Sequence, residues 1–85
     1  MDELREKVIK EVKHQIAWFA DRDQEEIKLE DKLVFDLGLD SLDILEFSME
    51  LESKLDVEID DDAAEAFVTV NDVVEFIFEK VKDKK

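Results

Sequence analysis

Apolar residues recur at spacings of three and four along the first twenty residues of the chain. This period places them on one face of a helix and predicts an amphipathic helix of about four turns. The apolar face consists of Leu4, Val8, Ile9, Val12 and Ile16. We expect Trp18, Phe19 and Ala20 to close this helix against the core.

Between about residues 21 and 40, apolar residues fall largely at alternate positions. They are Ile27, Leu29, Leu33, Phe35, Leu37 and Leu39. Alternation is typical of a strand, but a lone strand would have no partner elsewhere in the chain. We therefore predict an ordered loop that is pinned by apolar anchors. A loop of this length is uncommon in a compact domain. Its length argues either against assigning these residues to a loop or for a functional role of the loop.

A second helix is predicted to begin at Ser41, whose side chain suits an N-cap because it can accept from the unpaired amides of the first turn. Asp43 adds negative charge at the positive end of the helix dipole. The face expected to be buried consists of Ile44, Phe47, Ser48, Leu51 and Leu55. A second apolar row, Leu42, Leu45 and Met49, indicates either contact with another macromolecule or a wide core face.

The rest of the chain predicts a short helix from about Asp61 to Ala66 and a last helix opened by Thr69, which forms a capping box with Asp72. The inward stripe of the last helix consists of Val70, Val73, Val74, Ile77 and Val81. The fold class is therefore all-α. We predict one domain over residues 1–85, a small four-helix bundle of three main helices and one short helix, with a long ordered loop between the first and second helices.

Acidic residues outnumber basic ones and are concentrated in one segment. The chain holds 26 Asp and Glu against 12 Lys and Arg, a formal charge of −14. Residues 36–65 hold twelve acids against the single Lys54, which is −11 of that −14. This balance argues against a nucleic-acid binder of the usual basic kind. The segment is either a generally solvated face or a docking surface for basic partners.

Several kinds of site are excluded by what the sequence lacks. Without Cys there is no disulfide, thiolate metal site or cysteine nucleophile. No apolar run approaches the ~20 residues of a membrane span, and the N-terminus does not resemble a signal peptide, so we expect a cytoplasmic location. EF-hand spacing fails from Asp21 and from Asp60, which leaves only weak, unspecific cation binding by residues 60–62 open. With His14 as the only His and Gly38 as the only Gly, neither a triad nor a phosphate loop can form.

Ser41 is the remaining residue of interest. Its hydroxyl lies between a loop and a helix N-terminus, where the helix amides and dipole favour a phosphate group. Gly38, three residues earlier, gives the backbone the freedom to present the serine at a corner. From position alone, a plain capping serine is the other reading.

The stretch DLGLDSLD, residues 36–43, resembles the attachment motif D-x-G-x-D-S-L of acyl carrier proteins, and the resemblance extends over nearly the whole chain. In that family a phosphopantetheinyl transferase moves 4′-phosphopantetheine from coenzyme A onto the motif serine, and the thiol of the arm carries acyl groups as thioesters. The resemblance implies that Ser41 is the attachment site, that Asp40 and Leu42 belong to the cofactor-binding site beside it, and that these two residues also face partner enzymes. It also implies that basic docking patches of the transferase and of acyl-processing enzymes meet the acidic residues of the second helix, with Met49 at the apolar contact position of the family. These acidic residues are Asp43, Glu46, Glu50 and Glu52.

An acyl chain in water is costly, about 0.8 kcal/mol for each exposed CH₂, so a bundle that opens a cleft between its helices would protect it. The candidate lining is Phe47, Leu51, Ile59, Ala64, Phe67 and Val70, each of which could equally be ordinary core.

Some residues depart from the family pattern and bear on the pathway. Ser53 and Lys54 interrupt the acidic second half of the helix, and Leu39, Asp60 and the Trp18-Phe19 pair are also atypical. We predict a monomeric carrier of fatty-acid synthesis without enzyme activity. We expect it to be free-standing and not an excised module of a large synthase, because the chain starts at Met1 and has no flanking linker. The alternatives are a specialised carrier for polyketide, lipid or aminoacyl chemistry and an acidic helical adaptor that is never modified.

Overall fold

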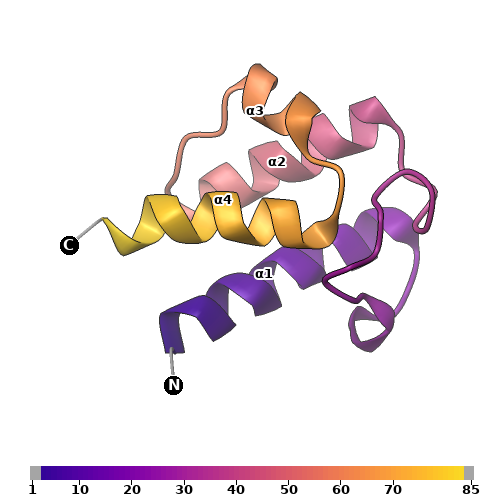
Figure 1. The fold of residues 1–85 in the computed structure, drawn as a ribbon, viewed down its shortest axis with the longest axis horizontal. Helices are drawn as coiled ribbons and strands as arrows, with labels where there is room; N and C mark the ends of the chain where they lie inside the picture. Colours follow the sequence, from indigo (N-terminus) through magenta and orange to yellow (C-terminus); the bar gives the residue numbers. More distant parts are fainter. Residues whose placement is uncertain (1–2, 84–85) are drawn as a thin grey trace.

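The computed structural model describes residues 3–83, which form four α-helices and one short 3₁₀ helix. The elements are α1 (Glu3–Ala20), η1 (Gln24–Glu26), α2 (Ser41–Leu55), α3 (Asp61–Ala66) and α4 (Val70–Lys82). α1 packs against both α2 and α4, and the short α3 packs against α2 (Figure 1). The all-α class with three main helices and one short helix is therefore confirmed.

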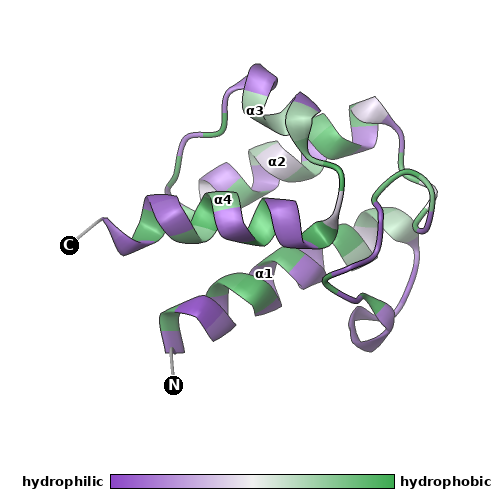
Figure 2. Cartoon of the chain, in the orientation of Figure 1, coloured by the Kyte–Doolittle hydropathy of each residue, from purple (hydrophilic) through white to green (hydrophobic). Residues whose placement is uncertain are grey.

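The helices bury their apolar faces in one core. Phe47 and Leu51 of α2 and Ile77 of α4 are fully buried, and hydrophobic and hydrophilic residues alternate around each helix (Figure 2). The predicted inward faces of α2 and α4 are buried except for their last members, Leu55 and Val81, which are half-buried. Burial of such a face, more than intrinsic propensity, holds helices of this length in place.

Two expectations for α1 are wrong. Trp18 does not close the helix against the core, because its side chain is 75% exposed. At 100° per residue it lies about 200° around the helix from the buried Ile16 and so faces away from the core. Leu4, at the start of the predicted stripe, is also exposed. Phe19 and Ala20 are half-buried against the core, as expected.

The connection from α1 to α2 is ordered, as predicted, although η1 was not foreseen. Its apolar anchors Ile27, Leu33, Leu37 and Leu39 are buried. Backbone hydrogen bonds tie it to the α3–α4 connection: the amide of Leu33 donates to the Val68 carbonyl at 2.8 Å, and the amide of Val70 donates to the Asp31 carbonyl at 3.0 Å. Within residues 3–83, only an isolated bridge between Lys32 and Thr69 resembles strand pairing.

Phe35 does not anchor the loop as the alternating pattern predicts, because its side chain is 85% exposed. The backbone at residues 33–37 forms a turn in which the amide of Asp36 donates to the Lys32 carbonyl at 2.9 Å. A turn of this helical kind brings Leu33 and Leu37 to the same side and leaves Phe35 on the other. The period of two therefore does not hold here.

Polar side chains define where the two later helices begin. Asp60 caps α3, since its Oδ1 accepts from the amide of Ala63 at 2.8 Å. Thr69 and Asp72 form the predicted capping box of α4. The bounds of α3 agree with the predicted short helix, and Asp60 now has a structural reason for its position.

Candidate functional site

The turn before α2 presents Ser41 at a corner of the molecule. Gly38 adopts φ +72°, a left-handed conformation that strains residues with a side chain, while a Cβ there would meet nothing within 4 Å. Glycine is therefore needed for its backbone angle and not for space. The next residue, Leu39, is buried and donates its amide to the Leu33 carbonyl at 3.0 Å. These features fix the direction in which the chain enters α2.

Asp40, and not Ser41, is the N-cap of α2, which corrects the expectation from sequence. Asp40 Oδ1 accepts from the amide of Asp43 at 2.8 Å, and Asp43 Oδ2 accepts from the amide of Asp40 at 3.2 Å. This reciprocal capping box uses the two aspartates that flank Ser41 and Leu42. Ser41 is the first helical residue, and its side chain is exposed and makes no hydrogen bond to the described residues.

The position of Ser41 suits a negatively charged group on its oxygen. The first-turn amides of Ser41 and Leu42 have no carbonyl partner within the helix, and the positive end of the dipole of the 15-residue α2 lies there. Both features favour phosphate oxygens at this end of the helix. The carboxylates of Asp40 and Asp43 are directed at each other's amides and leave the hydroxyl of Ser41 facing solvent.

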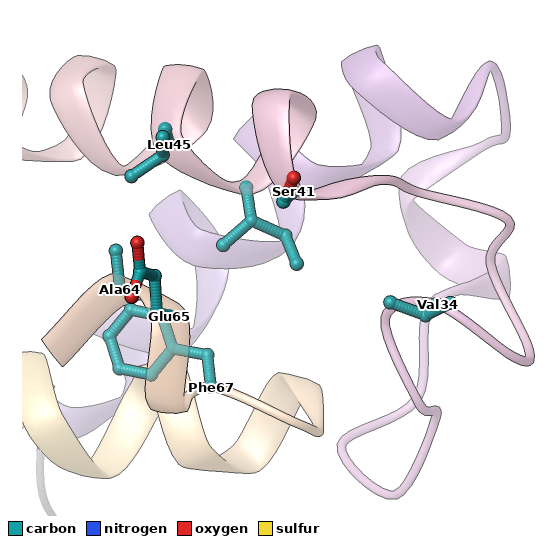
Figure 3. A pocket seen from close by; sticks show the side chains of 7 residues that line it. Val34, Ser41, Leu45, Ala64, Glu65 and Phe67 are labelled. Atoms are coloured by element: carbon teal, nitrogen blue, oxygen red, sulfur yellow. The ribbon is translucent and has the colours of Figure 1, made fainter. Parts of the chain in front are cut away.

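A pocket of about 250 Å³ opens beside Ser41, between the long loop, α2 and α3. Figure 3 shows Ser41 at the start of α2, Val34 across from it on the loop, and the side chains of Leu45, Ala64, Glu65 and Phe67 gathered between α2 and α3. Ile44 completes the lining. The walls are therefore mainly apolar, with Glu65 as the one acidic side chain among them.

The six candidate cavity residues fall into two groups. Ala64 and Phe67 line the pocket, whereas Phe47, Leu51, Ile59 and Val70 are buried in the core and do not reach it. Phe47 faces α1, where its ring packs edge-on against Phe19 with centroids 6.3 Å apart. The sequence reasoning missed Val34, Ile44, Leu45 and Glu65 as lining residues. The spacing of three and four from Ser41 was a usable signal for Ile44 and Leu45.

On the outer face of α2, charged and apolar side chains lie together. Glu46 and Glu50 are exposed, Asp43 is half-exposed, and Leu42 and Met49 are 61% and 63% exposed. We call these five residues the α2 outer face. Leu45 is not one of them, because it is half-buried and lines the pocket.

Glu52 lies apart from the α2 outer face. Its carboxylate accepts from the amide of Ile59 at 2.7 Å and so holds the connection between α2 and α3 in place. The carboxylate of Glu52 therefore has a hydrogen-bond partner within the chain, whereas Glu46 and Glu50 are exposed on the α2 outer face.

Other candidate sites find no support in the part of the chain that the structure describes. No group of His, Cys, Asp or Glu there could hold a metal ion, and Asp60 is used as a helix cap. His14 is exposed on α1. None of the described helices is both long enough and apolar enough to cross a bilayer.

Comparison with known proteins gives a consistent result. The family model described as "Phosphopantetheine attachment site" matches residues 10–77. The acyl carrier protein of Sulfurovum sp. is 55% identical over 53 residues, which is 62% of this chain and 71% of that protein. The acyl carrier protein of Exiguobacterium sibiricum is 41% identical over 73 residues, or 86% of this chain and 92% of that protein. A crystal structure of an acyl carrier protein from Thermotoga maritima superposes with a TM-score of 0.82 at 21% identity, covering 100% of this chain and 99% of the other, and supports the fold.

Proposed function

The chain belongs to the acyl carrier proteins with a phosphopantetheine attachment site, and from this premise we propose that it carries acyl intermediates of fatty-acid synthesis on an arm joined to Ser41. It is a carrier and not an enzyme. The 4′-phosphopantetheine arm supplies a thiol on which acyl groups form thioesters. We also propose that the protein is cytoplasmic and monomeric.

The observation that carries the proposal is that Ser41 lies at the rim of an apolar pocket with its hydroxyl exposed and without a hydrogen bond to the described residues. Its oxygen can attack the pantetheine-bearing phosphorus of the coenzyme A pyrophosphate, forming the Ser–O–P bond as the P–O bond to the leaving 3′,5′-ADP breaks. The hydroxyl proton passes to a base of the transferase, because His14 is the only His of this chain and lies on α1. Exposure of Ser41 gives the transferase access to it.

The residues around Ser41 fit the arm and its cargo. The first-turn amides favour the phosphate, and Ile44, Leu45 and Phe67 offer apolar surface to an acyl chain. At about 250 Å³ the pocket is just below the ~300–1,000 Å³ of typical ligand sites, so a long chain requires α3 to move away from α2. α3 has only six residues, which limits the packing that such an opening would disrupt.

We further propose that the α2 outer face docks basic patches of the transferase and of acyl-processing enzymes. Single exposed ion pairs are worth only about 0–1 kcal/mol, so Glu46 and Glu50 act mainly by steering encounter and orientation. Leu42 and Met49 add apolar contact between the charges. Weak docking suits a carrier that must leave each enzyme in turn.

The pathway is tested by offering the modified protein to enzymes of different chemistry. A malonyl transferase of dissociated fatty-acid synthesis should load the arm from malonyl coenzyme A, and Ser41→Ala should accept nothing. Loading only by an aminoacyl-adenylating enzyme would replace fatty-acid synthesis with the specialised alternative. Partner binding that is unchanged in Ser41→Ala, in a chain that no transferase modifies, would favour the unmodified adaptor.

A further inference from the structure

A polar atom is buried in α2 without a hydrogen-bond partner. Ser48 is 3% exposed, and its Oγ meets no donor or acceptor within residues 3–83. Buried polar atoms in native proteins are nearly always paired, so an exception requires a reason. Attachment of the arm to Ser41 does not use this hydroxyl.

The helical register directs Ser48 toward the pocket. Ser48 follows Ser41 by seven residues, which is two turns of helix to within about 20°, so the two serines share one face. Ile44 and Leu45, one turn before Ser48 on the same face, form the α2 wall of the pocket. Ser48 thus lies one turn beyond that wall and roughly 10.5 Å along the helix axis from Ser41.

A chain that enters between α2 and α3 and continues along this face passes from Ile44 to Ser48. A plain hydrocarbon would leave the hydroxyl unpaired, because it offers neither donor nor acceptor. A hydroxyl or keto oxygen on the chain would pair with it, and sites with buried polar groups discriminate strongly against analogues that lack the matching group. The position of Ser48 therefore favours cargo that carries oxygen along its length.

We infer that Ser48 is a specificity-determining residue for acyl chains bearing a hydroxyl or keto oxygen, which it binds by a hydrogen bond in the opened pocket. This inference rests on the proposed function, since the arm on Ser41 delivers the chain. The competing account is that Ser48 turns its hydroxyl to the carbonyl of Ile44, as serines within helices do. That account predicts no difference between plain and oxygenated chains.

The test compares acyl chains of equal length on the same protein. Decanoyl, 3-hydroxydecanoyl, 3-oxodecanoyl and 5-hydroxydecanoyl groups are loaded by a transferase from the corresponding coenzyme A thioesters, with loading verified by mass. The measured quantity is the melting temperature of each loaded form. Ser48→Ala removes the hydroxyl, and Ser53→Ala, at an exposed serine of the same helix, is the matched control.

At least one oxygenated chain should raise the melting temperature above that of the decanoyl form by roughly 4–8 °C, the shift expected for one net hydrogen bond in a domain of this size. Ser48→Ala should lose this difference and Ser53→Ala should keep it. Equal melting temperatures for all four chains, or a difference that persists in Ser48→Ala, would overturn the inference.

Failure of the proposed function is visible separately, because the parent chain would then accept no arm at all. In that case Ser41→Cys provides the only cysteine of the chain, and the same four acyl groups can be coupled there through a thioether-linked pantetheine. The comparison of Ser48→Ala with Ser53→Ala is then repeated with the same expected and contradicting results.

Discussion

Asp40 and Asp43 form a reciprocal capping box at the start of α2. Asp40 Oδ1 accepts from the amide of Asp43 at 2.8 Å, and Asp43 Oδ2 accepts from the amide of Asp40 at 3.2 Å. Ser41 lies between these two residues and takes no part in the cap. A serine in the capping role would direct its hydroxyl at the helix amides. The two aspartates instead leave that hydroxyl available for modification.

The first prediction separates the roles of Asp40 and Ser41. Asp40→Ala should lower the free energy of unfolding by about 1 kcal/mol, the usual cost of a lost N-cap, whereas Asp40→Asn should retain most of it. Ser41→Ala should change it by less than about 0.5 kcal/mol, as expected of an exposed residue without partners. Urea denaturation measures all three. If Ser41→Ala lowered the free energy of unfolding as much as Asp40→Ala does, Ser41 and not Asp40 would be the N-cap.

The second prediction concerns the unpaired hydroxyl of Ser48 in the unloaded protein. Ser48→Ala should raise the free energy of unfolding by about 1 kcal/mol, because a buried hydroxyl without a partner opposes folding. Ser53→Ala makes the same change in helix propensity at an exposed position and supplies the baseline. Denaturant melts of both variants give the difference. Destabilisation by Ser48→Ala relative to Ser53→Ala would mean that the hydroxyl is satisfied.

The third prediction tests docking on the α2 outer face. Glu46→Lys should lower kcat/KM of the transferase roughly two- to ten-fold at low ionic strength, because a steering charge is reversed, and added salt should reduce the effect. Glu25→Lys makes the same change in net charge at an exposed residue of η1 and is the matched control. Steady-state kinetics at two salt concentrations measure both. Equal losses in the two variants would show that net charge alone matters.

The fourth prediction concerns repulsion within residues 36–65, which carry −11 of the formal charge of −14. Added NaCl should raise the melting temperature, since screening weakens repulsion between like charges that are exposed. A series of salts is needed because some salts also strengthen apolar burial. A melting temperature that is the same at low and high ionic strength across the series would contradict the expectation.

Sequence patterns predicted the parts of the fold in which one period runs unbroken. The stripe that begins at Val70 and the cap at Thr69 predicted the last helix, and the short helix expected from about Asp61 to Ala66 is α3. The period failed for Phe35, because a hydrogen-bonded turn replaces the extended backbone that alternation assumes. Trp18 was misplaced because an aromatic residue was expected to be buried even though its position on the helix faces outward.

The candidate site was predictable where it depends on local sequence. The motif around Ser41 identifies that residue from the sequence alone. The pocket lining depends on where the loop and α3 meet α2, so Val34 and Glu65 could not be found from spacing alone. Two adjacent residues, Asp40 and Ser41, both suit an N-cap, and only the backbone geometry decides between them.

The central claim, that Ser41 bears the arm, is tested most directly by the intact mass of the protein after incubation with coenzyme A and a broad-specificity phosphopantetheinyl transferase. The parent chain and Ser53→Ala should each gain one phosphopantetheine, and Ser41→Ala should gain none. A gain in Ser41→Ala, or no gain in the parent chain with each of several transferases shown to be active on other carriers, would contradict the account.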